Sequence, residues 1–156
     1  MDDIDQRIVR ELQADARRSN AALAAAVGVS PSTMHGRVRS LQDRGVITGY
    51  HADVDLAALD RRVEALVSVR LQPKTAEAVE AFVEAIWARE ETMAVTMVTG
   101  PYDILIHLSV QDVSSLSQTV LTHIASAPNV VDEQTSIVFE HRRKRVLGGL
   151  GPDDSA

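Results

Sequence analysis

Polar and cationic side chains gather on one side of a helix that the sequence predicts over residues 31–44. At roughly 100° per residue, Ser32, His35 and Arg39 fall opposite the apolar stripe, together with Gly36. Hydroxyl, imidazole and guanidinium groups on one face can form hydrogen bonds with base edges in the major groove of DNA. We therefore predict that Ser32, His35 and Arg39 contact base edges.

Arginines on the flank of this helix have a different role open to them. Arg37 and Arg44 lie nearer the core, where a guanidinium suits either a backbone phosphate or an internal ion pair. We expect Arg37 mainly to position the DNA backbone. The alternative is that Arg37 and Arg39 are simply a solvated helix face. The predicted DNA-binding residues are Ser30, Ser32, Thr33, His35, Gly36, Arg37 and Arg39.

Gly36 lies in the middle of the predicted helix, at the centre of its DNA face. Glycine in a helix interior costs about 1 kcal/mol relative to alanine. It either allows the backbone to approach the groove closely or merely removes a contact. The sequence leaves both alternatives open.

A helix-turn-helix would position these residues. Asn20 can cap a first helix, because its side-chain oxygen can accept an orphan backbone N–H, and Val27 belongs to that helix's small-residue seam. Gly28 then ends the helix in a left-handed conformation. Ser30 and Pro31 begin the second helix as an N-cap and a proline at the first helical position. Because the first helix ends only a few residues before the second begins, the two helices must cross sharply.

The surrounding residues predict a small helical domain. An earlier helix over about 3–16 has an acidic start that suits the positive end of its dipole. Residues 46–52 predict a strand, either a wing or a pairing strand, interrupted by Gly49. The apolar stripes of the first and last helices contain Ile4, Ile8, Leu12, Met34, Val38 and Leu41. Residues 1–50 are therefore predicted to form a winged helix-turn-helix domain.

The rest of the chain alternates between strand and helix patterns in the order βαββαβ. Strand periodicity recurs over 65–71, 95–99, 104–110 and 130–139, and helical periodicity over 76–87 and 113–124. This order is that of the ferredoxin-like fold, in which both helices cover one face of the sheet. A second copy of the chain is the natural cover for the other face. We predict an α+β protein with a linker over 51–62, this domain over 63–147 and a disordered tail over 148–156.

The charge of the chain is unevenly distributed. The 156 residues carry a net charge of −6, which alone argues against a general nucleic-acid binder. Residues 1–50, however, have a net charge of +1, and residues 16–50 hold five Arg against one Asp. Charges are screened over about 10 Å in ordinary salt. This local patch therefore affects the binding of DNA phosphates more than the distant acidic part of the chain does. A weakly basic DNA reader gains from presenting several patches, which predicts an oligomer.

Other classes of site find little support. The chain has no cysteine, so it has neither disulfides nor thiolate metal sites. Its five histidines lack metal-ligand spacing, and no cofactor motif is present. With no leader and no long apolar run, a soluble cytoplasmic protein without membrane contact is expected.

Three separated runs give the chain a resemblance to a known family. These are VGVSPSTMHGRVRSLQDRGVITGY at 27–50, TGPYDILIHL at 99–108 and EQTSIVF at 133–139. In this order they resemble the Lrp/AsnC, or feast/famine, transcription regulators over nearly the whole chain. The resemblance implies a regulator that binds double-stranded DNA, whose effector domains form dimers that often assemble into tetramers or octamers.

The resemblance also implies a small-molecule effector, an amino acid, bound between subunits. Its pocket would use Thr99, Gly100, Tyr102 and Asp103 from the loop after the second strand, with Gln134, Thr135 and Ser136 from the last strand. A carboxylate can meet an α-ammonium group, while hydroxyls and backbone N–H groups can meet an α-carboxylate. The alternative is that residues 100–103 are only a turn, with Asp103 bonded to its own backbone.

Four further interpretations concern two other classes of protein, one histidine and the basic run. The sirohaem decarboxylases resemble these regulators in their two-domain fold, but the capped turn and the cationic helix favour DNA binding over an enzyme. A stand-alone metabolite sensor acting on a protein partner is another possibility. His107, on an apolar strand, is expected to be a core or interface histidine and not a catalyst. The basic run over 141–145 is expected to be a solvated end.

Overall fold

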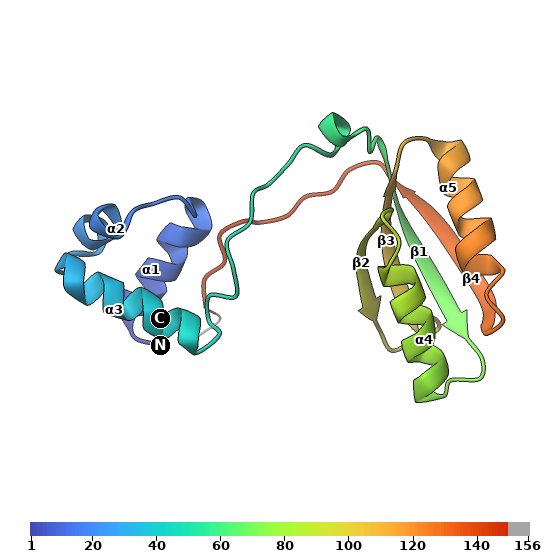
Figure 1. Cartoon of the computed structure of the whole chain (residues 1–156), viewed down its shortest axis with the longest axis horizontal. Helices are drawn as coiled ribbons and strands as arrows, with labels where there is room; N and C mark the ends of the chain where they lie inside the picture. The colour runs from blue at the N-terminus through green and yellow to red at the C-terminus, as the bar shows by residue number, and fades with distance from the viewer. Residues whose placement is uncertain (150–156) are drawn as a thin grey trace, which may run out of the picture. The chain divides into compact units, whose positions relative to one another are not determined.

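The computed structural model describes residues 1–149, and these residues form two compact units (Figure 1). Of the described residues, the first unit contains 1–53 and 142–149, and the second contains 54–141. The division differs from the prediction in that residues 142–147 lie with the first unit and not with the sheet, and the predicted linker over 51–62 is divided between the units. Most of the predicted tail, residues 150–156, lies outside the described residues.

The first unit is built on three helices, α1 (Asp3–Ala14), α2 (Asn20–Val27) and α3 (Pro31–Asp43). Each begins at a side chain that accepts an orphan backbone N–H, namely Asp2, Ser19 and Ser30. The prediction that Asn20 caps α2 is therefore wrong by one residue. Ser19 has the extended backbone that a cap needs, and its hydroxyl accepts the N–H of Ala22, so Asn20 is already helical.

The turn between α2 and α3 confirms the prediction from local sequence. Gly28 has a φ of 83°, in the left-handed region, and its N–H donates to the carbonyl of Ala24 at 2.9 Å. The N–H of Val29 donates to the same carbonyl. Ser30 and Pro31 then begin α3 as cap and first helical residue. The buried core under the turn consists of Ile8, Leu12, Leu23, Ala24, Val27, Met34, Val38 and Leu41.

The predicted strand over 46–52 is wrong. The chain turns at Gly45, whose φ is 69°, and the N–H groups of Val46 and Ile47 both donate to the carbonyl of Leu41. The side chain of Ile47 packs against the helical core. Strand periodicity needs a neighbouring strand to supply the ladder, and the described residues place none beside this segment. The helix-turn-helix therefore lacks a wing in the part of the chain that the structure describes.

The second unit confirms the βαββαβ order. After a 3₁₀ turn over Leu56–Leu59 in the predicted linker, a four-stranded sheet forms with the order β2-β3-β1-β4. Every pair of neighbouring strands is antiparallel. The elements are β1 (Val63–Leu71), α4 (Ala76–Trp87), β2 (Thr92–Met97), β3 (Ile104–Val110), α5 (Val113–Thr119) continued by a π turn over Val120–Ala125, and β4 (Val130–Val138).

Both helices cover one face of this sheet (Figure 1). Along β1 the residues from Ala65 to Leu71 alternate, and every second side chain is buried against α4 and α5. Phe82 and Ile86 of α4 belong to this core. The opposite face of the sheet carries Leu66, which is 43% exposed although it is a large apolar residue. The uncovered face is the one for which a second copy was predicted.

Candidate DNA interface and ligand site

Three hydroxyl groups cluster at the beginning of α3. The Ser30 hydroxyl oxygen lies 3.0 Å from that of Ser32 and 2.8 Å from that of Thr33. All three residues are exposed. They stand at the positive dipole end of a helix, where phosphate oxygens bind readily. The structure thus brings together the three predicted contacts at this end of the helix.

His35 and Arg39 lie further along the same exposed face. The Arg39 side chain is 75% exposed, and its Nε is 3.9 Å from Asp43 Oδ2, a surface pair that contributes little and exchanges easily. His35 Nδ1 lies 3.4 Å from the Asn20 amide nitrogen. Both border an open groove of about 480 Å³ lined by Asn20, His35, Val38, Arg39, Gln42, Asp43 and Tyr50.

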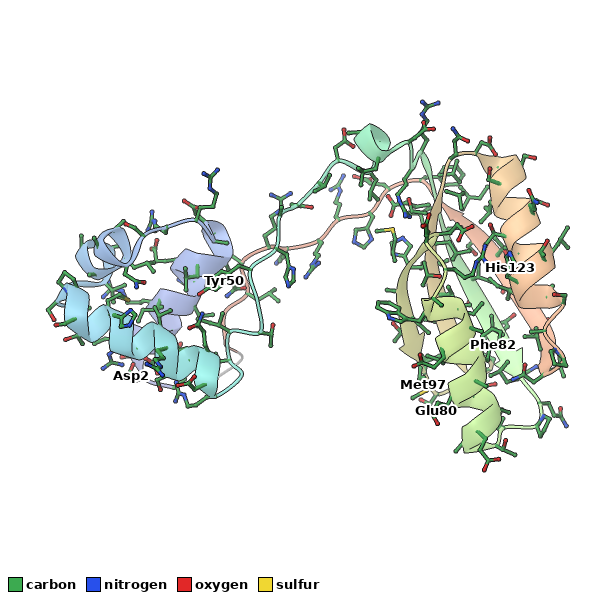
Figure 2. The ribbon with its side chains drawn as sticks, in the orientation of Figure 1. Asp2, Tyr50, Glu80, Phe82, Met97 and His123 are labelled. Atoms are coloured by element: carbon green, nitrogen blue, oxygen red, sulfur yellow. The ribbon has the colours of Figure 1, made fainter. Side chains whose placement is uncertain are left out.

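Sequence reasoning missed part of this groove. The position of Gln42 could have been predicted from the sequence, because Gln42 follows His35 by seven residues and shares its side of the helix. Its amide donates to the Tyr50 hydroxyl at 3.5 Å, and Figure 2 labels Tyr50. Asn20 comes from α2, so only the crossing of the two helices brings it to the groove. No pattern in the sequence indicates that Asn20 and Tyr50 line this groove.

Arg37 is engaged inside the unit. Its guanidinium lies 2.7 Å from Asp2 Oδ2 and 2.8 Å from Asp5 Oδ1, and Arg44 lies 3.0 Å from the other Asp5 oxygen. Asp5 is buried, and Figure 2 labels Asp2 at the start of α1. Of the two roles left open for Arg37 and Arg44, the structure shows the ion pairs. A phosphate contact by Arg37 remains a prediction that requires an exchange of partners.

These ion pairs shift the pKa of their members. The pKa of Asp2 lies below its usual range, first because its carboxylate accepts the backbone N–H of Asp5 and then because Arg37 donates to it. The two carboxylates raise the pKa of Arg37 in turn. The network joins the start of α1 to the flank of α3. These ion pairs hold α3 against α1.

Gly36 is exposed on α3, and a methyl group built there would meet no atom within 4 Å. Packing inside the free protein therefore does not require glycine at this position. Both alternatives for Gly36, a close approach of the backbone to the groove and a lost contact, therefore remain predictions about the complex with DNA.

Asp103 is the best connected of the predicted ligand-site residues. Its Oδ2 accepts the backbone N–H of Leu71 at 2.9 Å, and its Oδ1 lies 2.6 Å from Lys74 Nζ. The pKa of Asp103 is lowered, first by Lys74 and then by the Leu71 N–H. The carboxylate thus ties the start of β3 to the end of β1, and does not bond its own turn. Lys74 was missed, because only the sheet order brings it beside residue 103.

The other predicted ligand residues divide between the two faces of the sheet. The Tyr102 hydroxyl donates to Gln134 Oε1 at 3.1 Å. Ser136 shares the face of Gln134, because side chains two residues apart in a strand point the same way. Thr135 points to the opposite face, where its hydroxyl donates to Glu133. The structure therefore brings Tyr102, Gln134 and Ser136 to one side and leaves Thr135 away from them.

The loop before Tyr102 is exposed at Thr99 and Gly100, and Gly100 has a φ of 131°, where glycine is favoured. His107 lies on the uncovered face of the sheet, with its Nε2 2.9 Å from Glu64 Oε2. Among the described residues, no group of three potential ligands could hold a metal ion. No helix in this part of the chain is long and apolar enough to cross a membrane.

Comparison with known proteins also divides the chain into two parts, with residues 142–146 matched as part of the second. Residues 1–42 match the AsnC-type helix-turn-helix domain, and residues 64–146 match the Lrp/AsnC ligand binding domain. The chain is 41% identical over 143 residues to the HTH-type transcriptional regulator AldR of Mycolicibacterium smegmatis, covering 92% of this chain and 84% of that protein. It is 34% identical over 140 residues to the leucine-responsive regulatory protein of Escherichia coli K12, covering 90% and 85%.

Solved structures agree. The transcriptional regulator NMB0573 of Neisseria meningitidis, in complex with L-Met, superposes with a TM-score of 0.86 at 27% identity, covering 92% of this chain and 93% of that one. AsnC of E. coli superposes with a TM-score of 0.83 at 27% identity, covering 94% and 97%.

Proposed function

The chain belongs to the Lrp/AsnC family of transcription regulators, and from that premise we propose that it reads specific DNA through α3 and responds to an amino acid. The two matched domains make it a DNA-binding transcription regulator with a ligand-binding domain. The proposal adds which side chains read the bases, which ligand is sensed and how copies of the chain combine. We further propose that it acts by binding, without catalysis, and in the cytoplasm where DNA is accessible.

The exposed face of α3 is the observation that carries the DNA-reading role. Ser32, His35 and Arg39 are exposed and take no part in the core, whose contacts all come from the opposite side of the helix. Arg39 lies near Asp43, and His35 lies near Asn20. These exposed contacts are weak, so hydrogen bonds with base edges can replace them at little cost in free energy. Arg37, in contrast, is committed to holding α3 on α1. We therefore assign the recognition of specific bases to Ser32, His35 and Arg39.

An amino acid suits the polar groups around residue 103. Asp103 and Lys74 place a carboxylate and an ammonium side by side, so an α-ammonium and an α-carboxylate could each replace one partner of that pair. The Tyr102 hydroxyl and the Gln134 amide nearby supply neutral hydrogen-bonding groups. The relative from N. meningitidis was solved with L-Met, which supports an amino acid as the ligand of this chain.

A second copy of the chain is proposed to cover the open face of the sheet. Leu66 is substantially exposed there, and Leu105 and Val138 are only half-buried. Burial of apolar area on such a face contributes about 25 cal/mol per Å², and a two-fold pair of sheets would bring two helix-turn-helix units together. We propose a homodimer that assembles further into a tetramer or octamer. A ligand bound near that face would shift the pairing and so the affinity for DNA.

Two measurements test the proposal. In fluorescence anisotropy, the full chain should bind its own upstream promoter more tightly than a scrambled duplex at moderate salt; equal affinities, with and without candidate amino acids, refute the DNA-reading role. In a thermal-shift screen of the common amino acids, a ligand present at about 100 times its Kd adds about 2.7 kcal/mol. If none raises the melting temperature, the proposed amino-acid effector is wrong.

A further inference from the structure

The segment after β4 returns to the first unit and is held there at two points. The side-chain amide of Gln13 on α1 accepts the N–H of Leu147 at 2.8 Å and donates to the Leu147 carbonyl at 3.0 Å. This reciprocal pair fixes one backbone position of the segment. Two residues earlier, the guanidinium of Arg145 pairs with the carboxylate of Asp53. Of the returning chain, the residues from 142 to 149 therefore belong to the helical unit.

The returning segment changes the charge of the DNA-binding unit. Residues 1–53 contain seven Arg and seven Asp or Glu, so they are neutral as a set. Residues 142–145 add three Arg and one Lys, which gives the described part of the unit eleven cations against seven anions, a net +4. Residues 54–141 hold five cations against thirteen anions, a net −8. The entire positive balance of the unit thus comes from residues 142–145.

The cations of this segment lie near the end of the recognition helix. Gln42 of α3 contacts Tyr50, and Asp53 follows three residues later and holds Arg145. Three residues span at most about 11 Å even when fully extended, which limits the distance between the backbones of Tyr50 and Asp53. The major groove is about 12 Å wide, so we expect long cationic side chains anchored at Asp53 to reach phosphates beside α3.

Two cations of the segment are available for such contacts. Arg143 and Lys144 are exposed, and in the described part of the chain neither takes part in an ion pair. Arg145 and Leu147, immediately after them, are the anchored positions. We propose that Arg143 and Lys144 form a second phosphate-binding element, held on the DNA-binding unit by Gln13 and Asp53. This inference rests on the proposed binding of DNA by α3, and it replaces the expectation of a merely solvated end.

The test is the salt dependence of DNA binding by the full chain carrying R143A and K144A together. Each phosphate contact contributes about 0.9 to the slope of log K against log salt. Losing two contacts should make the slope shallower by about 1.8 for each DNA-binding unit that engages the duplex. Between about 50 and 200 mM salt, the wild type should then lose about twelvefold more affinity than the variant for each engaged unit. The loss should be equal on the promoter and on a scrambled duplex, because phosphates carry no sequence information.

Two controls sharpen the result. R62A with R70A removes the same charge from exposed positions of the other unit, and should leave the slope unchanged. Q13A keeps every charge but removes the anchor, and should make the slope shallower in the direction of R143A/K144A. Melting curves check that each variant is folded.

The outcomes separate the inference from the proposed function. A wild-type slope in R143A/K144A overturns the inference, as does a change on the promoter alone. A wild-type slope in Q13A overturns the docked arrangement. If the wild type does not prefer its promoter, the proposed function fails, yet the slope on scrambled duplex still measures the second element.

Discussion

Replacing Gly36 with alanine should stabilise the free protein and weaken its complex with DNA. Gly36 lies inside α3, five residues after its first residue, and an added Cβ meets nothing within 4 Å. The gain is therefore the difference in helix propensity alone, about 0.5–1 kcal/mol in the free energy of unfolding. In the complex, a methyl group forced into a close backbone–groove contact should cost about 1–3 kcal/mol, the range found for overpacked interiors. The Kd should then rise by between about five and 150-fold.

Urea denaturation followed by helical circular dichroism measures the first effect, and anisotropy with promoter duplex measures the second. S40A, on the exposed shoulder of the same helix, is the matched control, since it changes helix propensity without touching the centre of the DNA face. If G36A destabilises the free protein, the added Cβ meets neighbouring atoms, and the open space around Gly36 is contradicted. If it stabilises the protein and leaves the Kd as it was, the backbone does not approach the groove, and Gly36 is only a lost contact.

Three further substitutions test other parts of the structure. R39A should cost about 1–3 kcal/mol at one base position of the promoter, measured by competition with single-base variants; a uniform loss would make Arg39 a phosphate contact. G28A should lower the free energy of unfolding by about 1–2 kcal/mol, because alanine resists the left-handed conformation and no neighbour clashes with its Cβ; an unchanged urea midpoint would contradict this. D103A should abolish the thermal shift given by the effector, whereas D132N, which removes a more exposed carboxylate, should retain it. Because the folded pKa of Asp103 is lowered, its stabilisation is complete above the ordinary value of 3.8 and is lost as pH falls through the folded pKa; acid unfolding of D103N should lack that loss.

Local features of the helix-turn-helix could be predicted from the sequence because they depend on few residues. The left-handed turn at Gly28 and the start at Ser30 and Pro31 each follow from backbone preferences within one or two positions. The error at Asn20 is of the same local kind, since serine and asparagine cap almost equally well and Ser19 comes first. The order of strands and helices was likewise readable from hydrophobic periodicity.

Features that depend on distant residues were not predictable in the same way. The segment over 46–52 has strand periodicity, but it has no neighbouring strand in the described chain. The pairing of Asp103 with Lys74 requires the order of strands in the sheet, and the return of Leu147 to Gln13 joins residues 134 positions apart. Thr135 was a different case, because strand alternation alone separates it from Gln134 and Ser136.

The return of the chain to its starting domain makes the sheet an insertion within a discontinuous DNA-binding module. A truncated fragment ending at Asp53 would keep all three helices and their core but would have no net charge, whereas residues 142–145 give the described part of the module an excess of four cations. Such a fragment should therefore understate the affinity of the intact regulator for a duplex, however well it folds. A single cut in the chain just after Asp53 would separate the three helices covalently from the sheet, and the two fragments would then be joined by the non-covalent contacts of Gln13 with Leu147 and of Asp53 with Arg145.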